Sequence, residues 1–439
     1  MKLLIITHLI PYPLSEGGKI SQYALIDYLR KKCSITLLLF VHTEADDVAV
    51  LHLKKTWQDV AFEVITMRPA LPPRRKRTAK TLLQAACKAV LHKSHVGYDK
   101  MFPSSHLSQS DEETRNENII DLVDFIKPRP RENIDKINAI IEDFKPDIIQ
   151  IEFVYLLDLV LCLPPHIKKI FIHHELRFMR VETEMATIEN GSSNYARYLK
   201  RLCEISEIGL LKNFDAIVTM SEDDERLLLQ SLPKKEIYSS PFPILDSEIK
   251  EIKRDNLIIE KLVFVGGEFH SPNKDAVEWY ISSIAKMVVE KLGLTLHIIG
   301  NWSLETMEKY KNHPSIHFTG YIEDLSDYCR NSIMLVPLRI GSGIRQKILY
   351  AAAAGVPIIS TTIGSEGIPE NAKFCVEANT PEQFIDGIGK IANDINFTEK
   401  MVANAQIILG KYYSQQVAGQ KRLDLYQSVL ESESLVLPS

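Results

Sequence analysis

Apolar runs of strand length alternate along this chain with segments of helical periodicity, and this alternation restricts the fold more than any other feature. It begins with Leu3–Thr7, continues with a helical pattern at Lys19–Arg30, and returns to a strand at Ser34–Phe40. Later strands of this series are expected at Ile148–Ile151, Ile170–Ile172 and Ala216–Thr219. The alternation predicts an α/β protein in which helices wrap a parallel sheet.

A second α/β series follows Ser239–Asn256, a stretch with two prolines and clustered charges. Its strands are predicted at Lys261–Val265, Thr295–Ile299, Ile316–Phe318, Ser332–Pro337 and Pro357–Ser360, and its helices at Pro272–Glu290, Asp324–Arg330 and Ile344–Ala354. Ser271 is expected to cap the first of these helices. Because 439 residues exceed what one core usually organises, we expect two domains, at residues 1–245 and 256–413.

The composition is that of a water-soluble globular protein, with 25% charged and 45% hydrophobic residues. A formal net charge of −5 supplies no general basic field, which argues against nucleic acid as a partner. The six cysteines are scattered without a CxxC pair, as expected of reduced thiols. Glu152 and Asp158 interrupt the most apolar long run, Ile148–Leu163, and the N-terminus shows no secretory signal, so a cytoplasmic protein is expected.

The segment Leu335–Gly355 combines a strand, a glycine-rich turn and the start of a helix. This is the layout of a phosphate-binding site, because glycines let the backbone approach a ligand and a helix start presents unpaired N–H groups. Arg345 and Lys347 fall in the first helical turn, where the helix dipole disfavours cations. A bound anion would remove this conflict. The alternative is that both side chains bend into water or meet a carboxylate.

The C-terminal half resembles the GT-B glycosyltransferases of the GT4 type (glycosyl transferases group 1). The motifs that carry the resemblance occur in family order, as FVGG (264–267) with HSPNKDA (270–276), HIIG (297–300), GYIED (320–324), VPLR (336–339), GSGIRQKIL (341–349), AGVP (354–357) and GSEG (364–367). The resemblance implies two Rossmann-like domains that face each other across a cleft. It also implies that a closing helix, within residues 414–439, crosses back onto the N-terminal domain.

The N-terminal half resembles the same family in shorter stretches. Gly17 and Gly18 resemble the glycine-rich loop that faces the sugar donor, and the segment 173–180 resembles the region after a central strand, with His174 as the candidate contact to the transferred sugar. The donor site implied by the resemblance comprises Gly17, Gly18, Gly266, Gly267, Gly341, Ser342, Gly343, Tyr350 and Glu366, with His174, Arg345 and Lys347 as catalytic residues. The expected reaction is retaining and requires neither a metal nor another cofactor beyond the nucleoside-diphosphate sugar.

Two positions depart from the family pattern. The glutamate that should follow the KIL triplet and hold the donor ribose is Tyr350, and the earlier family glutamate falls on Ser342. A phenol offers one oxygen where a carboxylate accepts from two hydroxyls, so ribose recognition must be weaker or differently built. Glu366 is the nearest substitute by sequence. Tyr350 either packs against Ala351–Ala354 or contacts the ligand.

A basic segment, LPPRRKRTAK (71–80), precedes an apolar-periodic stretch, Leu82–Leu91. This combination suggests contact with anionic lipid headgroups or a lipid-linked acceptor, and a solvated basic loop is the alternative. The basic side chains are Arg74, Arg75, Lys76, Arg77 and Lys80.

Three functions are compatible with these features. The first is a cytoplasmic glycosyltransferase, located at the inner face of the membrane, that builds a cell-surface polysaccharide or glycolipid. The second is a catalytically silent GT-B protein that binds a sugar nucleotide or a partner transferase, which Tyr350 favours. The third, a sugar-nucleotide epimerase of the same architecture, fits the glycine-rich segments least well.

Overall fold

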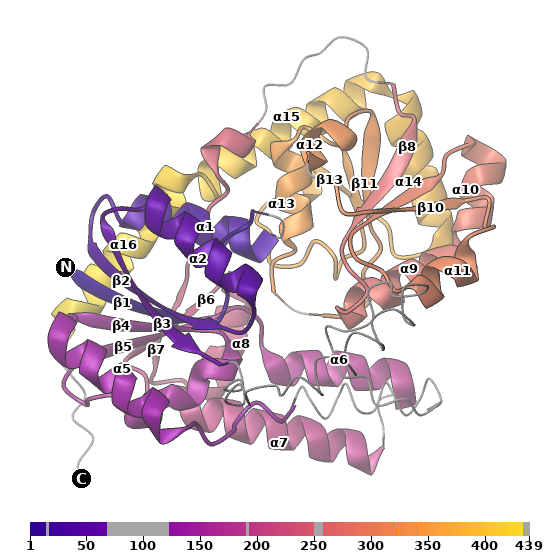
Figure 1. The fold of residues 1–439 in the computed structure, drawn as a ribbon. Coiled ribbons are helices and arrows are strands. Elements are labelled where there is room, and N and C mark those ends of the chain that lie inside the picture. Colours follow the sequence, from indigo (N-terminus) through magenta and orange to yellow (C-terminus); the bar gives the residue numbers. More distant parts are fainter. Residues whose placement is uncertain are drawn as a thin grey trace, which may run out of the picture.

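The computed structural model describes residues 1–14, 17–67, 123–189, 193–249, 258–322, 324–341 and 343–432. These residues form two α/β domains, each built on its own parallel sheet (Figure 1). The predicted fold class, two Rossmann-like domains, is confirmed. None of the helices described here has both the length and the apolar character needed to cross a membrane.

The first sheet has seven strands in the order β3-β2-β1-β4-β5-β6-β7. The strands are β1 (Lys2–Thr7), β2 (Ser34–Val41), β3 (Val60–Thr66), β4 (Ile148–Glu152), β5 (Lys168–His173), β6 (Ala216–Thr219) and β7 (Glu236–Ser239). Leu4 and Ile6 of β1 join the apolar core on one face of the sheet, while Leu3 and Ile5 join the core on the other. Helices therefore cover both faces, which explains why the central strands are apolar throughout.

The described helices around this sheet include α1 (Gly17–Leu29), α2 (Glu44–Thr56), α5 (Arg131–Phe144), α6 (Arg177–Glu189), α7 (Asn194–Leu211) and α8 (Glu222–Ser231). Local sequence fixes several of their starts. Thr43 and Asp46 form a reciprocal capping box at α2, and the Ser221 hydroxyl accepts a hydrogen bond from the Asp224 N–H at α8.

The second sheet has six strands in the order β10-β9-β8-β11-β12-β13. The strands are β8 (Lys261–Val265), β9 (Leu296–Ile299), β10 (Ile316–Gly320), β11 (Ser332–Val336), β12 (Ile358–Ser360) and β13 (Cys375–Glu377). The helices around it are α9 (Ser271–Ser283), α10 (Ala285–Leu292), α11 (Leu304–Tyr310), α12 (Leu325–Tyr328), α13 (Gln346–Ala353), α14 (Pro381–Asn393) and α15 (Ile395–Tyr412).

Three details of the second domain differ from the sequence-based expectations. The helix expected over 272–290 is two helices, α9 and α10, which meet at Ile284. The capping position of α9 is His270 rather than Ser271, because the Ser271 hydroxyl donates instead to Glu184 of the other domain, at 2.6 Å. Helix α13 begins at Gln346, so Arg345 occupies its N-cap with an extended backbone and precedes the first turn.

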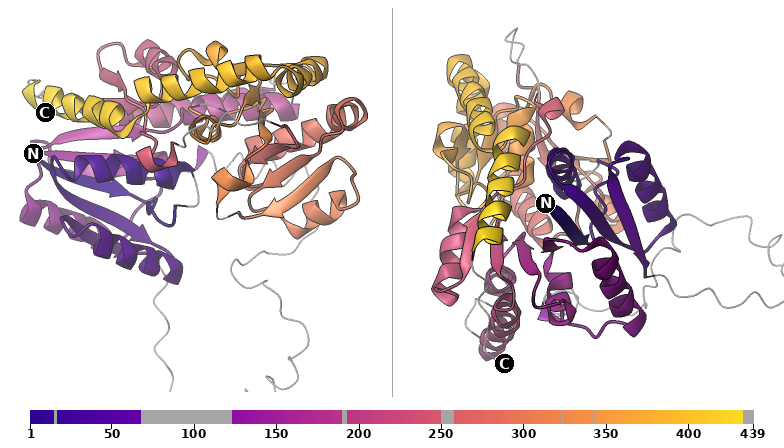
Figure 2. Two further views of the ribbon diagram at one scale, coloured as in Figure 1. Left: turned by 90° about the horizontal axis from the view of Figure 1, so that it is seen from above. Right: turned by 90° about the vertical axis from the view of Figure 1, so that its left-hand side faces the viewer.

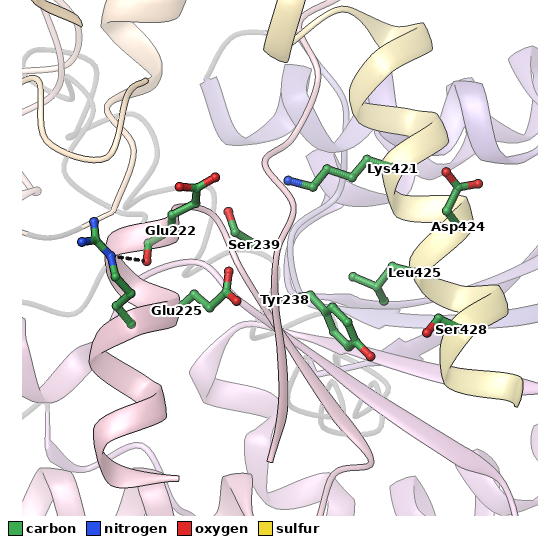
Figure 3. Close-up of a pocket in the computed structure, with 9 residues that line it drawn as sticks. Glu222, Glu225, Tyr238, Ser239, Lys421, Asp424, Leu425 and Ser428 are labelled. Carbon is green, nitrogen blue, oxygen red and sulfur yellow. Dashed lines mark hydrogen bonds between the residues drawn. The ribbon is translucent and has the colours of Figure 1, made fainter. Parts of the chain in front are cut away.

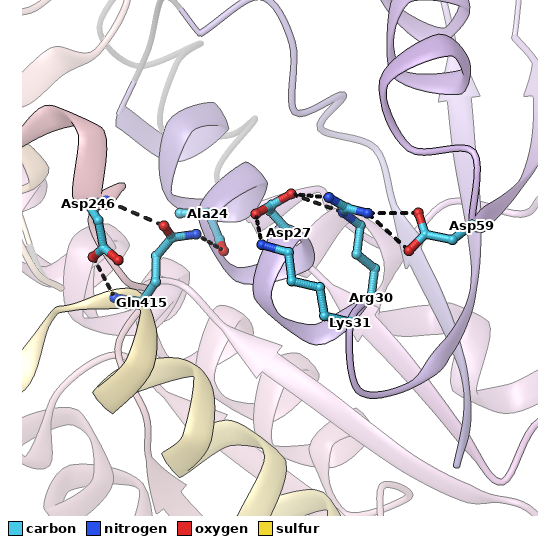
Figure 4. Close-up of polar contacts among 7 residues, drawn as sticks. All are labelled: Ala24, Asp27, Arg30, Lys31, Asp59, Asp246 and Gln415. Carbon is cyan, nitrogen blue, oxygen red and sulfur yellow. Dashed lines mark hydrogen bonds and ion pairs between the residues drawn. The ribbon is translucent and has the colours of Figure 1, made fainter.

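The last helix, α16 (Gln415–Glu431), leaves α15 and packs against α1 of the first domain, so that α15 and α16 run along both domains (Figure 2). Gln415 fixes this crossing, since its amide nitrogen donates to the Ala24 carbonyl (3.0 Å) and its backbone N–H to Asp246 (3.3 Å) (Figure 4). On α1, Arg30 bridges Asp27 and Asp59 in the same view. The predicted return of the chain to the N-terminal domain is therefore present.

Candidate active site

The carboxyl ends of strands from the two sheets meet between the domains. Gly343, which follows β11, approaches the first domain so closely that a Cβ there would lie 2.8 Å from the carbonyl oxygen of His174, the residue after β5. A Cβ on Gly367, which follows β12, would lie 2.9 Å from the Cβ of Ser221, the residue at the end of β6. Ligands of open α/β sheets bind at such carboxyl edges.

The two glycine segments of the second domain require glycine for different reasons. Gly341 and Gly343 have φ angles of 114° and 77°, which L side chains rarely adopt. A Cβ on Gly266 would lie 2.5 Å from the Asn273 amide, and Gly267 packs against the Asn301 carbonyl. All four predicted glycines therefore lie in tight backbone at the carboxyl edge of the second sheet. Ser342 lies outside the described residues.

Arg345 is the N-cap residue of α13, and Lys347 lies in the first turn of that helix. Arg345 donates to the Gly343 carbonyl at 2.6 Å, and burial lowers the pKa of its guanidinium although the charges of Glu366 and Glu175 oppose that change. Lys347 donates to the Asn273 side-chain carbonyl at 2.8 Å, with its ammonium 4.1 Å from the centre of the Phe264 ring. Burial, followed by repulsion from Arg345, lowers the pKa of Lys347 to about 7.

Tyr350 connects the two domains. Its hydroxyl donates to the Gly17 carbonyl at 3.2 Å, and one turn earlier on α13 the Gln346 amide oxygen accepts from Ser21 at 2.8 Å. Burial raises the pKa of the Tyr350 phenol. The side chain therefore neither packs only against its own helix nor lies free. It contacts the predicted glycine loop of the opposite domain.

Glu366 lies after β12 on the same side as Arg345. Partial burial raises the pKa of its carboxyl, and the positive charge of Arg345 opposes that rise. Gly18 is in the first turn of α1, where a Cβ would meet only Leu9, at 3.4 Å. The structure thus places Gly17, Gly18 and Tyr350 around the junction of α1 and α13, whereas Glu366 lies near Arg345 and the start of α8.

His174 follows β5 and is held from two sides. Its Nε2 lies 3.3 Å from Glu152 Oε2, and its ring stacks on Phe153 with the two centres 3.8 Å apart and the planes at 6°. Sequence reasoning missed Glu152 as a site residue. A signal was available, because Glu152 is a carboxylate inside an otherwise apolar run that ends a strand.

An acid–base cluster lies beside His174. Arg180 donates to Glu175 (3.0 Å) and to Glu184 (2.8 Å), and Glu184 accepts from Ser271 of the second domain. Burial would raise the pKa of Glu175, but the charges of Arg180 and Arg177 outweigh it and lower that pKa to about 2. This cluster is a second polar bridge between the domains. The sequence indicated the segment 173–180 as part of the site but did not predict this contact between the domains.

A pocket of about 570 Å³ lies elsewhere, on the outer surface between α8, the edge strand β7 and α16 (Figure 3). Glu222 and Glu225 line one side of it and Lys421 and Asp424 the other, with Tyr238 between them. None of the predicted site residues lines it. The predicted basic segment 71–80 lies outside the described residues.

Comparisons with known proteins agree with this geometry. Residues 260–394 match the family model for glycosyl transferases group 1. Across 98% of this chain, the structure is similar to sucrose-phosphate synthase from Thermosynechococcus elongatus (12% identity, TM-score 0.62, 100% of that chain). It is similar over the same share to Staphylococcus aureus TarM in a complex that contains UDP (11% identity, TM-score 0.61, 100% of that chain). The chain has the GT-B fold, and its second domain matches the glycosyl transferases group 1 family.

The resemblance drawn from the sequence motifs is therefore confirmed for the family and for the GT-B fold. A curated relative, an uncharacterised 44.6 kDa protein from the cps region of Klebsiella pneumoniae, is 28% identical over 163 residues. That match covers 35% of this GT-B chain and 42% of the relative. A further GT-B structure with 98% coverage, HepE from Anabaena in complex with UDP, has 11% identity and a TM-score of 0.58, and 100% of it is covered.

Proposed function

We propose that this chain transfers a sugar from a nucleoside-diphosphate sugar to a glycan or lipid-linked acceptor. One observation carries the proposal: the ammonium of Lys347, beside Arg345 at the end of a glycine-rich turn, meets an amide oxygen and an aromatic ring but no carboxylate of the described residues, and burial lowers its pKa to about 7. Burying an ammonium without an anionic partner costs free energy. A diphosphate supplies that charge, and the solved complexes of TarM and HepE contain UDP.

The same groups suit the chemistry of the transfer. The bond from the anomeric carbon to the diphosphate breaks, and negative charge grows on the departing diphosphate. Fixed cations and backbone N–H groups stabilise that charge best where water is excluded. Arg345 and Lys347 provide the cations, and Gly17, Gly18, Gly341 and Gly343 allow the backbone to approach. We propose that the transfer is retaining and that these cations take the place of a metal ion.

We assign the transferred sugar to His174 and the acceptor to the first domain. His174 lies directly across from Gly343, so a sugar attached to a diphosphate on the second domain would point toward it. The relative from a cps region suggests cell-surface polysaccharide synthesis as the setting. The reaction then takes place in the cytoplasm, where nucleotide sugars are available.

The exposed face of α7 supports a further element of the proposal, contact with an anionic membrane. Four apolar side chains follow one another along this face at helical spacing: Tyr195 (45% exposed), Tyr198 (58%), Leu202 (41%) and Ile205 (57%). Arg197, Lys200 and Arg201 lie on the same helix, where Lys200 pairs with Glu182 and Arg201 with Glu204. Aromatic and aliphatic side chains beside lysine and arginine are typical of helices that lie in a membrane interface.

Co-sedimentation with vesicles tests the membrane contact. A variant with Tyr198, Leu202 and Ile205 changed to serine should lose binding to vesicles that contain phosphatidylserine. The matched control changes Val48 and Leu51 of α2, which are 66% and 55% exposed, and should bind as the wild type does. Equal binding of wild type to neutral and anionic vesicles, or a stable dimer that buries this face, would contradict the membrane proposal.

Tyr350 favours the second candidate, a silent GT-B protein, because it stands where the family has an acidic residue. A screen of donor hydrolysis over UDP-, GDP- and dTDP-sugars separates the two functions. The transferase predicts turnover of at least one donor and its loss in Lys347→Met. Binding of a nucleoside diphosphate without hydrolysis or transfer of any donor would favour the silent protein.

A further inference from the structure

A chain of buried polar side chains runs from the crossing helix α16 to the carboxyl end of β4. The Tyr426 hydroxyl donates to the Gln150 amide oxygen, and the Gln150 amide nitrogen donates to Glu152 Oε1 at 2.6 Å. From the other side, Gln22 of α1 donates to Glu152 Oε2 at 2.9 Å. Each of these four residues is at most 1% exposed. Both amide donors therefore converge on one buried carboxylate.

This series of buried polar side chains ends at His174. Its Nε2 lies 3.3 Å from Glu152 Oε2, and its side chain is 20% exposed whereas that of Glu152 is 1% exposed. Phe153 stacks on the imidazole and Phe242 lies 5.3 Å from it, so the plane of the ring is fixed as well. The chain thus ends at the one member that reaches the space between the domains.

We propose that Glu152 is a positioning residue that holds His174 as the tautomer protonated on Nε2. A carboxylate only accepts hydrogen bonds, so the imidazole nitrogen facing it must donate. Nδ1 is then an acceptor, and it receives a hydrogen bond from a hydroxyl of the transferred sugar. This assignment to the sugar rests on the proposed function, whereas the tautomer itself does not. Helix α16 takes part because Tyr426 orients the Gln150 amide.

The neighbouring histidine provides an internal control. His173 Nε2 lies 2.8 Å from Glu207, but both side chains are at most 1% exposed. Glu207 also accepts from the backbone N–H groups of Arg177 and Phe178, so this pair holds the start of α6. The two histidines have the same carboxylate partner type, and only His174 reaches the space where a ligand could bind.

Nitrogen-15 NMR of histidine-labelled protein at pH 8 tests the proposal directly, with His174→Asn to assign the signal. We expect Nε2–H in the wild type and Nδ1–H in Glu152→Gln, because the Gln amide can donate to Nε2 and reverse the bond. Glu207→Gln should leave the His174 tautomer unchanged. In Glu152→Gln we also expect kcat for sugar transfer to fall about 10- to 100-fold, as for loss of groups that orient a functional histidine, with KM for the donor within about threefold.

Two results would overturn the proposal: a wild-type His174 that carries its proton on Nδ1, or a loss of kcat in Glu152→Gln with the tautomer unchanged. If Glu152→Gln does not fold, the wild-type spectrum still decides the tautomer, and Tyr426→Phe tests the far end through a smaller loss of kcat. If no donor is turned over by the wild type, the proposed function fails while the tautomer measurement stands.

Discussion

The positively charged and histidine side chains at the carboxyl edges of the two sheets have different partners. On the first sheet, His173, His174 and Arg180 each face a buried or half-buried carboxylate. On the second, Lys347 meets an amide oxygen and an aromatic ring, and no carboxylate among the described residues lies within 4.0 Å of its ammonium. On the first edge, each of these groups therefore already has a carboxylate partner. The second keeps positive charge available for an anion.

The largest expected effect comes from removing charge at the second edge. Arg345→Ala should lower donor turnover about 10²- to 10³-fold, since loss of one preorganised contact to developing charge costs about 2.7–4 kcal/mol. The melting temperature should change far less. Steady-state kinetics with the best donor and thermal melts measure the two effects.

Arg339→Ala is the matched control for Arg345. Arg339 follows the same strand but forms an ion pair with Asp275 and lies over the Trp279 ring. Its loss should leave turnover within about threefold, as is usual for a partly exposed ion pair. Equal losses in the two variants would show that Arg345 contributes no more to turnover than an arginine in an ordinary ion pair.

The next largest effect is expected from substitutions at the contact between the two domains. In Gly17→Ala, a Cβ would lie 2.7 Å from the Gln346 Cβ and 3.2 Å from the Tyr350 ring, so the domains must move apart. In Gly18→Ala the nearest atom is a Leu9 methyl at 3.4 Å, an ordinary contact. We expect kcat/KM to fall about tenfold or more in Gly17→Ala, whereas Gly18→Ala should leave the contact between the domains intact. Small-angle scattering should show the larger radius of gyration only for Gly17→Ala.

Sequence reasoning reached the fold because the information was local. Strand-length apolar runs and glycine-bearing turns such as Gly341–Gly343 depend on neighbouring residues alone, and residues 335–355 therefore held their predicted order of strand, turn and helix. Strands β3, β7 and β13 were not predicted. Each of them is an edge strand of its sheet. Their sequences are short or mix apolar with polar residues, so they lack the continuous apolar character of a central strand.

The site was less predictable because its contacts join residues far apart in the chain. Glu152 pairs with His174, and Tyr350 with Gly17, which lies 333 positions away. Ser271 carries a sequence typical of a helix cap, yet its hydroxyl donates to Glu184 across the domain boundary. No periodicity or propensity encodes such pairs, since they arise only when the two domains are in place.

Protonation of Lys347 provides a smaller, pH-dependent effect. Its pKa of about 7 means that the side chain is mostly neutral at pH 8, and a bound diphosphate should raise that pKa again. Binding of UDP at pH 8 should therefore take up most of one proton, and affinity should fall by up to about tenfold per pH unit above pH 7. Calorimetry in buffers of different ionisation enthalpy measures the uptake, and Lys347→Met should show none.

The same pKa has a consequence for stability with a definite sign. An unfolded lysine titrates near pH 10.4, so between about pH 7 and 10 the unfolded chain binds more protons at this position than the folded chain. The contribution of Lys347 to the free energy of unfolding should then increase with pH in this window. A wild-type protein that loses stability there relative to Lys347→Met would contradict a lowered pKa of Lys347.

Substitutions of Tyr350 have the smallest expected effect. They test whether the contact between Tyr350 and Gly17, which connects the two domains, supports nucleotide binding. Tyr350→Phe removes one hydrogen bond to the Gly17 carbonyl, worth about 0.5–1.5 kcal/mol, so affinity for UDP should fall by no more than about tenfold. Tyr350→Glu restores the family residue, but its carboxylate would face that same carbonyl oxygen in a buried position, and both groups only accept hydrogen bonds. Calorimetric titration with UDP should therefore rank the proteins as wild type, then Phe, then Glu. If the Glu variant binds UDP more tightly than the wild type, its carboxylate accepts hydrogen bonds from the ribose hydroxyls. The contact between Tyr350 and Gly17 would then contribute nothing to nucleotide binding.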